Sequence, residues 1–209
     1  PSTDIQRMGL SLMQDDKDID GIKKVAIERR DDVSTLAYEQ LMEWFETEEK
    51  RVEDMAFLDS AMEAKNSSVQ SRAFDRILER YHEVESDEDE DSRASELEML
   101  LNMMKKGLNT SDKDLKRQVI HKLGRNGVVD VLDEVLRLAK TETSRDQTQY
   151  YTSLVAICDR TRNADGSLSE VVKDVAPTLV ERWFYDPTGT TNQNAILIAL
   201  HTINDRSIV

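Results

Sequence analysis

The chain has 209 residues, of which 38% are hydrophobic and 33% charged, and its formal net charge is −14. Only 7 glycines, 3 prolines and 5% aromatic residues argue against a β-sandwich, which needs many turn, β-branched and aromatic residues. This scarcity of helix-breaking and aromatic residues favours a mostly helical protein. The negative charge disfavours nonspecific binding to nucleic acids, because the average field repels phosphate.

Two further features bear on the compartment. Cys158 is the single cysteine, which excludes an intramolecular disulfide, and its apolar helix face suits a small buried hydrophobic residue. No apolar run approaches the roughly 20 residues that cross a bilayer, and no signal-peptide pattern opens the sequence. We therefore expect a cytoplasmic protein with no membrane partner.

The pattern of residues 1–30 predicts an irregular helical cap. A first short helix with an apolar stripe is followed by an acidic turn and by a second short helix, IKKVAIERR. The array of helices then runs from residue 31 to residue 209, continuous with the cap. The stripe consists of Ile5, Met8, Leu12 and Met13.

A first helix pair is predicted after the cap. Asp31 or Asp32 can cap its first helix, and its second helix is expected near residues 47–64. Apolar residues recur along both helices at the helical spacing of three and four. The second helix carries Val52, Met55, Ala56, Phe57, Leu58 and Met62.

The next pair starts at Ser67 or Ser68, either of which can cap a helix. Its partner near 94–108 ends at the glycine stop signal of Gly107. The acidic run at residues 85–92, ESDEDEDS, has nothing to bury and predicts a solvated loop between the two helices.

The clearest pair occupies residues 111–140. Ser111 or Asp112 starts its first helix, Gly124 and Gly127 flank a tight turn, and a regular Leu/Val ladder runs over 128–140.

Two more first helices are expected near 145 and 190, and a further second helix near 168–185. Pro177 falls inside that second helix and predicts a kink. The last helix, NAILIALHTI, is apolar nearly all round and needs cover on more than one side.

Residues 111–140 resemble a HEAT repeat, or the related armadillo-like class. The resemblance is carried by Asp112 and Leu115, by KLGRNG at 122–127, and by VVDVLDEVLRLAK at 128–140. Lys116 stands where the family has arginine, the two alanine positions carry Val119 and Lys122, and the first-helix proline is missing. The resemblance implies an all-α fold, an α-solenoid of about four to five antiparallel helix pairs whose second helices line a concave, protein-binding face. An irregular compact helical bundle is the alternative.

A basic stretch interrupts the acidic chain. Seven basic and two acidic residues lie between positions 105 and 125. Such a stretch can bind an acidic protein partner, a phosphate-bearing ligand or the acidic surface of another copy, whereas the alternative is an ordinary solvated helix face. The candidate contact residues are Lys105, Lys106, Lys113, Lys116, Arg117 and Arg125.

Aromatic residues cluster at 183–185 and 150–151. Three consecutive aromatic residues cannot all face one core, so Trp183 or Tyr185 is a candidate anchor for a partner. The alternative is that the cluster closes the core under the last helix.

Asp16, Asp18 and Asp20, followed by Gly21, resemble half of a calcium loop. The bidentate glutamate of such loops is missing, so an acidic turn with a helix cap is the favoured interpretation.

Nothing in the sequence indicates catalysis. The three histidines show no helical HxxxH pairing, and the sequence has no Cys/His metal spacing, phosphate-binding glycine loop or nucleophile motif, so no catalytic residue and no cofactor is predicted. A buried pair of acids would leave no such signal in the sequence. We therefore expect a non-enzymatic protein–protein interaction scaffold or adaptor. The alternatives are a self-assembling structural component and a HEAT-like enzyme or nucleic-acid-processing protein.

Overall fold

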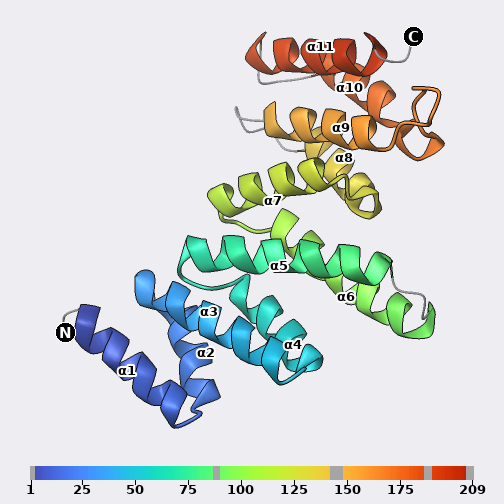
Figure 1. The fold of residues 1–209 in the computed structure, drawn as a ribbon. Coiled ribbons are helices and arrows are strands. Elements are labelled where there is room, and N and C mark those ends of the chain that lie inside the picture. The colour runs from blue at the N-terminus through green and yellow to red at the C-terminus, as the bar shows by residue number, and fades with distance from the viewer. Residues whose placement is uncertain (1–2, 87–89, 142–147, 186–189, 206–209) are drawn as a thin grey trace. The chain divides into compact units, whose positions relative to one another are not determined.

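The computed structural model describes residues 3–86, 90–141, 148–185 and 190–205. Within these ranges the chain forms eleven α-helices and two short 3-10 helices, and no strand (Figure 1). The prediction of an all-α protein is therefore confirmed. The helices form two compact units, Pro1–Met103 and Met104–Val209.

Unit 1 is built from neighbouring helices that pack in an alternating order. α1 packs on α3 and α3 packs on α5, while α2 packs on α4. From α1 to α5, each helix also contacts the next helix in the chain, as α2 does with α3 and α4 with α5. The helices are α1 (Thr3–Asp15), α2 (Ile19–Glu28), α3 (Asp32–Thr47), α4 (Arg51–Ala61), α5 (Ser67–Glu85) and most of α6 (Glu90–Leu108).

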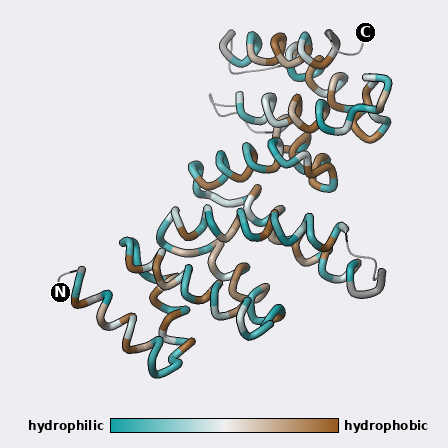
Figure 2. The backbone as a smooth tube through the Cα atoms, viewed as in Figure 1, coloured by the Kyte–Doolittle hydropathy of each residue, from teal (hydrophilic) through white to brown (hydrophobic). Residues whose placement is uncertain are grey.

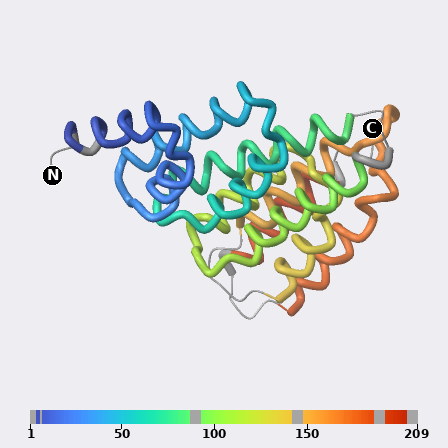
Figure 3. Tube along the Cα trace, turned by 90° about the horizontal axis from the view of Figure 1, so that it is seen from below, coloured from blue at the N-terminus to red at the C-terminus, as the bar shows by residue number. Residues whose placement is uncertain are grey.

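Unit 2 repeats the same order. α7 packs on α9 and α9 packs on α11, while α8 packs on α10, and Figures 1 and 3 both show this succession. The helices are α7 (Lys113–Asn126), α8 (Leu132–Thr141), α9 (Thr148–Arg160), α10 (Val175–Tyr185) and α11 (Thr190–Asp205). The 3-10 helices Val129–Val131 and Glu170–Val172 precede α8 and α10.

Both cores are made by helices with one apolar face. Figure 2 shows hydrophobic and hydrophilic residues alternating along each tube, as amphipathic helices require. In unit 1, the ring of Phe57 lies 5.9 Å from the rings of both Tyr38 and Phe45. In unit 2, Tyr151, Leu154 and Ile157 of α9 are almost completely buried.

Two predicted boundaries of the clearest pair are confirmed: Asp112 caps its first helix, α7, and Gly127 ends that helix. The Asp112 carboxylate accepts hydrogen bonds from the N–H groups of Asp114 and Leu115 at 2.9 and 3.0 Å, as an N-cap does. Gly127 ends α7 in the left-handed conformation, with φ of 68°, which glycine adopts without steric cost.

The predicted cap of α5 is wrong. Asn66, rather than Ser67 or Ser68, accepts the hydrogen bond from Ser68 N at 2.9 Å. Its amide also donates to Ser34 Oγ at 2.7 Å and to the Asp31 carbonyl at 3.0 Å, so this one side chain ties α5 to the start of α3.

The cap of α3 also differs from the expected arrangement. Asp31 holds the N-cap position, but its carboxylate makes no capping hydrogen bond. It binds Arg29 instead, and this contact lowers the pKa of Asp31. The Ser34 hydroxyl donates to the Asp31 carbonyl at 2.6 Å.

Pro177 does not kink a helix. Glu170–Val172 forms a separate 3-10 helix, and α10 begins only at Val175, so Pro177 is its third residue. The N–H groups of the first turn have no intrahelical acceptor, and a proline there costs no hydrogen bond. The predicted single helix over 168–185 is therefore two segments.

The acidic loop is shorter than predicted. α5 continues to Glu85 and α6 begins at Glu90, so the last acidic residues of the run are helical. Residues 87–89 lie outside the described part of the chain.

Gly124 does not flank the turn but lies buried inside α7. A Cβ atom at this position would lie 2.6 Å from Ser153 Cα of α9. The Ser153 hydroxyl donates to the carbonyl of Ile120 at 2.8 Å, which joins the same two helices. Gly124 therefore permits the close approach of α7 and α9.

Candidate functional site

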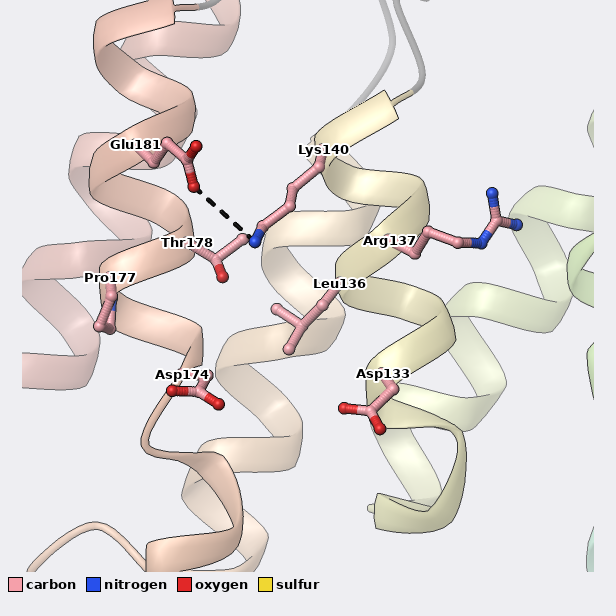
Figure 4. Close-up of a pocket in the computed structure, with 8 residues that line it drawn as sticks. All are labelled: Asp133, Leu136, Arg137, Lys140, Asp174, Pro177, Thr178 and Glu181. Carbon is pink, nitrogen blue, oxygen red and sulfur yellow. Dashed lines mark ion pairs between the residues drawn. The ribbon is translucent and has the colours of Figure 1, made fainter.

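A groove of about 460 Å³ runs between α8 and α10 in unit 2 (Figure 4). These two helices are the second members of adjacent helix pairs, which is where the sequence predicts a binding face. The groove is lined by Asp133, Leu136, Arg137, Lys140, Asp174, Pro177, Thr178 and Glu181.

The groove combines a buried floor with charged walls. Leu136 and Thr178 are buried, whereas the charged residues that line it are exposed. Lys140 Nζ of α8 lies 3.7 Å from Glu181 Oε2 of α10, and this ion pair spans one end. At the other end lie the carboxylates of Asp133 and Asp174, on opposite sides of the groove (Figure 4). Three carboxylates against two basic groups give the groove a net negative charge.

A network of hydrogen bonds braces the α8 side of the groove. The Arg137 guanidinium donates through Nε and Nη2 to the two Glu134 oxygens at 2.8 and 2.6 Å, a bidentate pairing. The Asn109 amide donates to Glu134 at 2.6 Å and accepts from Arg137 at 2.9 Å. Figure 4 accordingly shows Arg137 directed away from α10.

This network lowers the pKa of Glu134. The hydrogen bonds from Arg137 contribute most and that from Asn109 adds to them, and together they lower the pKa from 4.5 to about 2. The Lys105 charge acts in the same direction.

We expect Glu134→Gln to lower the free energy of unfolding at pH 7 by about 1–2 kcal/mol, after allowance for solvent screening of the half-exposed Arg137. Because the folded pKa is depressed, the stabilisation is fully present above about pH 4.5 and is lost as pH falls through about 2. Urea unfolding of wild type and Glu134→Gln at a series of pH values from 7 to 2 measures this difference in unfolding free energy. Glu170→Gln, which removes an exposed pair with Lys173, is the control and should change stability by under about 0.5 kcal/mol. If the difference in unfolding free energy between Glu134→Gln and wild type stayed the same as the pH falls, it would contradict the assignment of this stabilisation to the ionised Glu134.

Arg182 fixes the spacing of the two groove helices. Arg182 is only 8% exposed, and its Nη1 donates to the carbonyl of Lys140 at 3.0 Å. The positive charge of the Arg182 guanidinium thus lies at the C-terminal end of α8, where the helix dipole favours a cation. The groove is therefore held open between two helices that are directly joined.

The structure distributes the predicted basic residues over two helices. Lys105 and Lys106 lie in the last turn of α6, and the other four lie on α7. Arg117 lies 3.6 Å from Asp114 of its own helix, and Lys116 is only half-exposed. None of these six residues lines the groove between α8 and α10, so their role as a contact surface stays a prediction.

The aromatic candidates divide by exposure. Tyr185 is 77% exposed and its neighbour Phe184 66%, whereas Trp183 is half-buried with its ring against Phe184. Tyr150 and Tyr151 belong to the core. Of the two predicted anchors, Tyr185 is thus the one that is available at the surface.

The aspartates of the half calcium loop form a turn and a cap. Asp18 caps α2 by accepting from Gly21 N at 3.0 Å, and Lys17 before it has a positive φ of 57°. In the described ranges, no group of three or more His, Cys, Asp or Glu residues is arranged to hold a metal ion. Cys158 is buried, and burial raises the pKa of its thiol to about 11.

In comparisons with known proteins, no protein-family model, curated protein or solved structure matches the chain. None of the helices described in the structure is both long and apolar enough to cross a bilayer.

The individual groove residues were not singled out by the sequence. Asp133, Asp174 and Glu181 carry no motif, and charged residues on the outer face of a helix are ordinary. The only signal available was the assignment of 128–140 and 168–185 as second helices, which places the groove approximately.

Proposed function

We propose that the chain is a non-enzymatic interaction scaffold whose helix pairs stack as an α-solenoid and bind a protein partner on the face of the second helices. The observation that carries the proposal is the groove between α8 and α10. It lies between second helices, has a buried floor, and presents charges of both signs on its walls.

The packing order supports the stacked arrangement. In unit 2, first helices pack on first helices, as α7 does on α9, and second helices on second helices, as α8 does on α10; in unit 1, α3 packs on α5 and α2 on α4. An irregular bundle has no reason to keep this order in both halves of the chain. Helical repeats of this kind make extended binding surfaces.

The negative charge of the groove favours a partner segment that carries basic residues. The basic stretch on α6 and α7 is a separate candidate, for an acidic partner. Two charge-reversal variants separate these surfaces: Asp133→Lys with Asp174→Lys for the groove, and Lys113→Glu, Lys116→Glu with Arg117→Glu for the basic stretch.

We expect affinity capture from the native source, followed by titration of the purified partner, to show binding weakened by at least about tenfold in the groove variant. The control replaces the exposed residues Glu43 and Glu98 of unit 1 with lysine, which makes the same change in net charge. It should bind as wild type does. Equal binding by groove variant and control would contradict the groove as the contact surface. A loss confined to the basic-stretch variant would move the interface to α7.

A further inference from the structure

Unit 1 contains a second cavity, of about 370 Å³, that the proposed partner groove does not use. It lies among α3, α4 and α5. Its lining consists of Phe45, Glu46, Glu49, Arg51, Asp54, Arg76, Arg80 and Glu83.

Asp54 is the unusual group in this cavity. The residue is 3% exposed, and its Oδ1 atom is buried without a hydrogen-bond partner. The nearest cationic atom to its carboxylate is Nη2 of Arg80, at 3.8 Å from Oδ2, which is too long for a hydrogen bond. A buried carboxylate oxygen without a donor is costly, so it points to a missing partner.

The arginines around the cavity are already held by other carboxylates. Arg76 lies 2.8 Å from Glu46, and Arg80 lies 2.8 Å from Glu83. Arg51 lies 3.0 Å from Glu96 of α6. Each guanidinium therefore has a partner nearer than Asp54, and none donates to Asp54 Oδ1, although the Nε atoms of Arg76 and Arg80 are themselves buried without an acceptor.

The charge balance leaves room for one more cation. Six carboxylates line the cavity or pair with its arginines, against three arginines. Glu49, at the rim, is exposed and makes no ion pair with any residue described in the structure. Burial raises the pKa of Asp54 despite the attraction of Arg76 and Arg80, so desolvation outweighs the stabilisation that the two arginines give its negative charge. The six carboxylates are Glu46, Glu49, Asp54, Glu79, Glu83 and Glu96.

We propose that this cavity binds a guanidinium group, with Asp54 Oδ1 as its buried acceptor and Glu49 as its acceptor at the rim. A guanidinium carries several N–H donors in one plane and is more weakly hydrated than an ammonium, so it can reach a deep and a shallow carboxylate together at lower desolvation cost. The group can belong to a small alkylguanidine or to an arginine side chain.

Calorimetric titration of the full chain with n-butylguanidinium tests the site. n-Butylurea is the matched control, because it has nearly the same shape and no charge. We expect saturable binding of the guanidinium and at least about tenfold weaker binding of the urea. Equal binding of the two compounds, or no binding of either, would overturn the proposal.

Two blocked tripeptides distinguish the source of the group, one with a central arginine and one with citrulline, its uncharged counterpart. If the arginine peptide binds more tightly than n-butylguanidinium, the site accepts a side chain of a peptide. If only n-butylguanidinium binds, the site accepts a free small cation. Either result supports the guanidinium site.

Two substitutions assign the site to Asp54. Asp54→Asn keeps the shape and removes the charge, and it should weaken n-butylguanidinium binding by at least about tenfold. Asp59→Asn, the same change on the same helix but outside the cavity lining, should bind as wild type does. Wild-type affinity in a folded Asp54→Asn variant would overturn the assignment. Should that variant fail to fold, Glu49→Gln at the exposed rim supplies the test: it should weaken binding by about threefold, and unchanged affinity would overturn the site.

Discussion

Replacement of Gly124 by alanine is expected to lower the free energy of unfolding by about 2 kcal/mol. The new methyl carbon would lie 2.6 Å from both Cα and Cβ of Ser153, so backbone as well as side chain would have to move. Ser153 cannot move freely, because its hydroxyl is bonded to the carbonyl of Ile120. Alanine's better helix propensity, worth about 1 kcal/mol, offsets only part of this cost. Urea unfolding followed by circular dichroism measures the change.

Gly9 provides the matched control for this substitution. It also lies inside a helix, α1, but no atom outside the helix backbone lies within 4 Å of a Cβ placed there. Gly9→Ala should therefore raise the free energy of unfolding by about 0.5–1 kcal/mol, through helix propensity alone. Opposite signs for the two substitutions are the expected result. A stabilising Gly124→Ala would show that α7 and α9 are farther apart than described.

Replacement of Tyr151 by alanine is expected to lower the free energy of unfolding by about 3–5 kcal/mol, the range for removing a large buried aromatic side chain. Tyr151 is 1% exposed and is among the largest of the fully buried side chains. It belongs to α9, which packs against α7, α8, α10 and α11, so the cavity left behind would lie at the centre of unit 2.

The same substitution at Tyr185 is the control. That side chain is 77% exposed, and its loss should change the unfolding free energy by under about 0.5 kcal/mol. Thermal and urea unfolding of the two variants measure the contrast. A large loss of unfolding free energy in Tyr185→Ala would show that the aromatic residues at 183–185 close the core, which is the alternative interpretation of the sequence.

The starts of the first helices at 32, 67 and 112 were predictable to within about one residue because they depend on local chemistry. Asp112 followed by a helical apolar pattern marks a start, and Gly127 marks an end, without any knowledge of the neighbours. The first helices predicted near 32, 67 and 112 begin at Asp32, Ser67 and Lys113. The all-helical class follows from the same local signals repeated along the chain.

Features that depend on distant neighbours were not predictable. The role of Gly124 is set by Ser153, which is distant in sequence and adjacent only once the helices pack. The predicted apolar stripe of α4 includes Val52, yet Val52 is 80% exposed while Asp54 is buried. A hydrophobic pattern cannot identify a charged residue that faces inward, so the cavity around Asp54 was not foreseen. For the groove between α8 and α10, the sequence predicted the helices that form it but not the residues that line it.

The packing order within each unit has a consequence for how the chain folds. Every main helix contact joins helices that are one or two places apart in the chain, such as α4 with α5 or α7 with α9. The relative contact order of each unit is therefore low, and little loop-closure entropy is lost before native contacts form. Helical proteins with such local contacts fold on a scale of microseconds to milliseconds. Within each unit, a helix can therefore pack on its near neighbours in the chain without waiting for a remote segment.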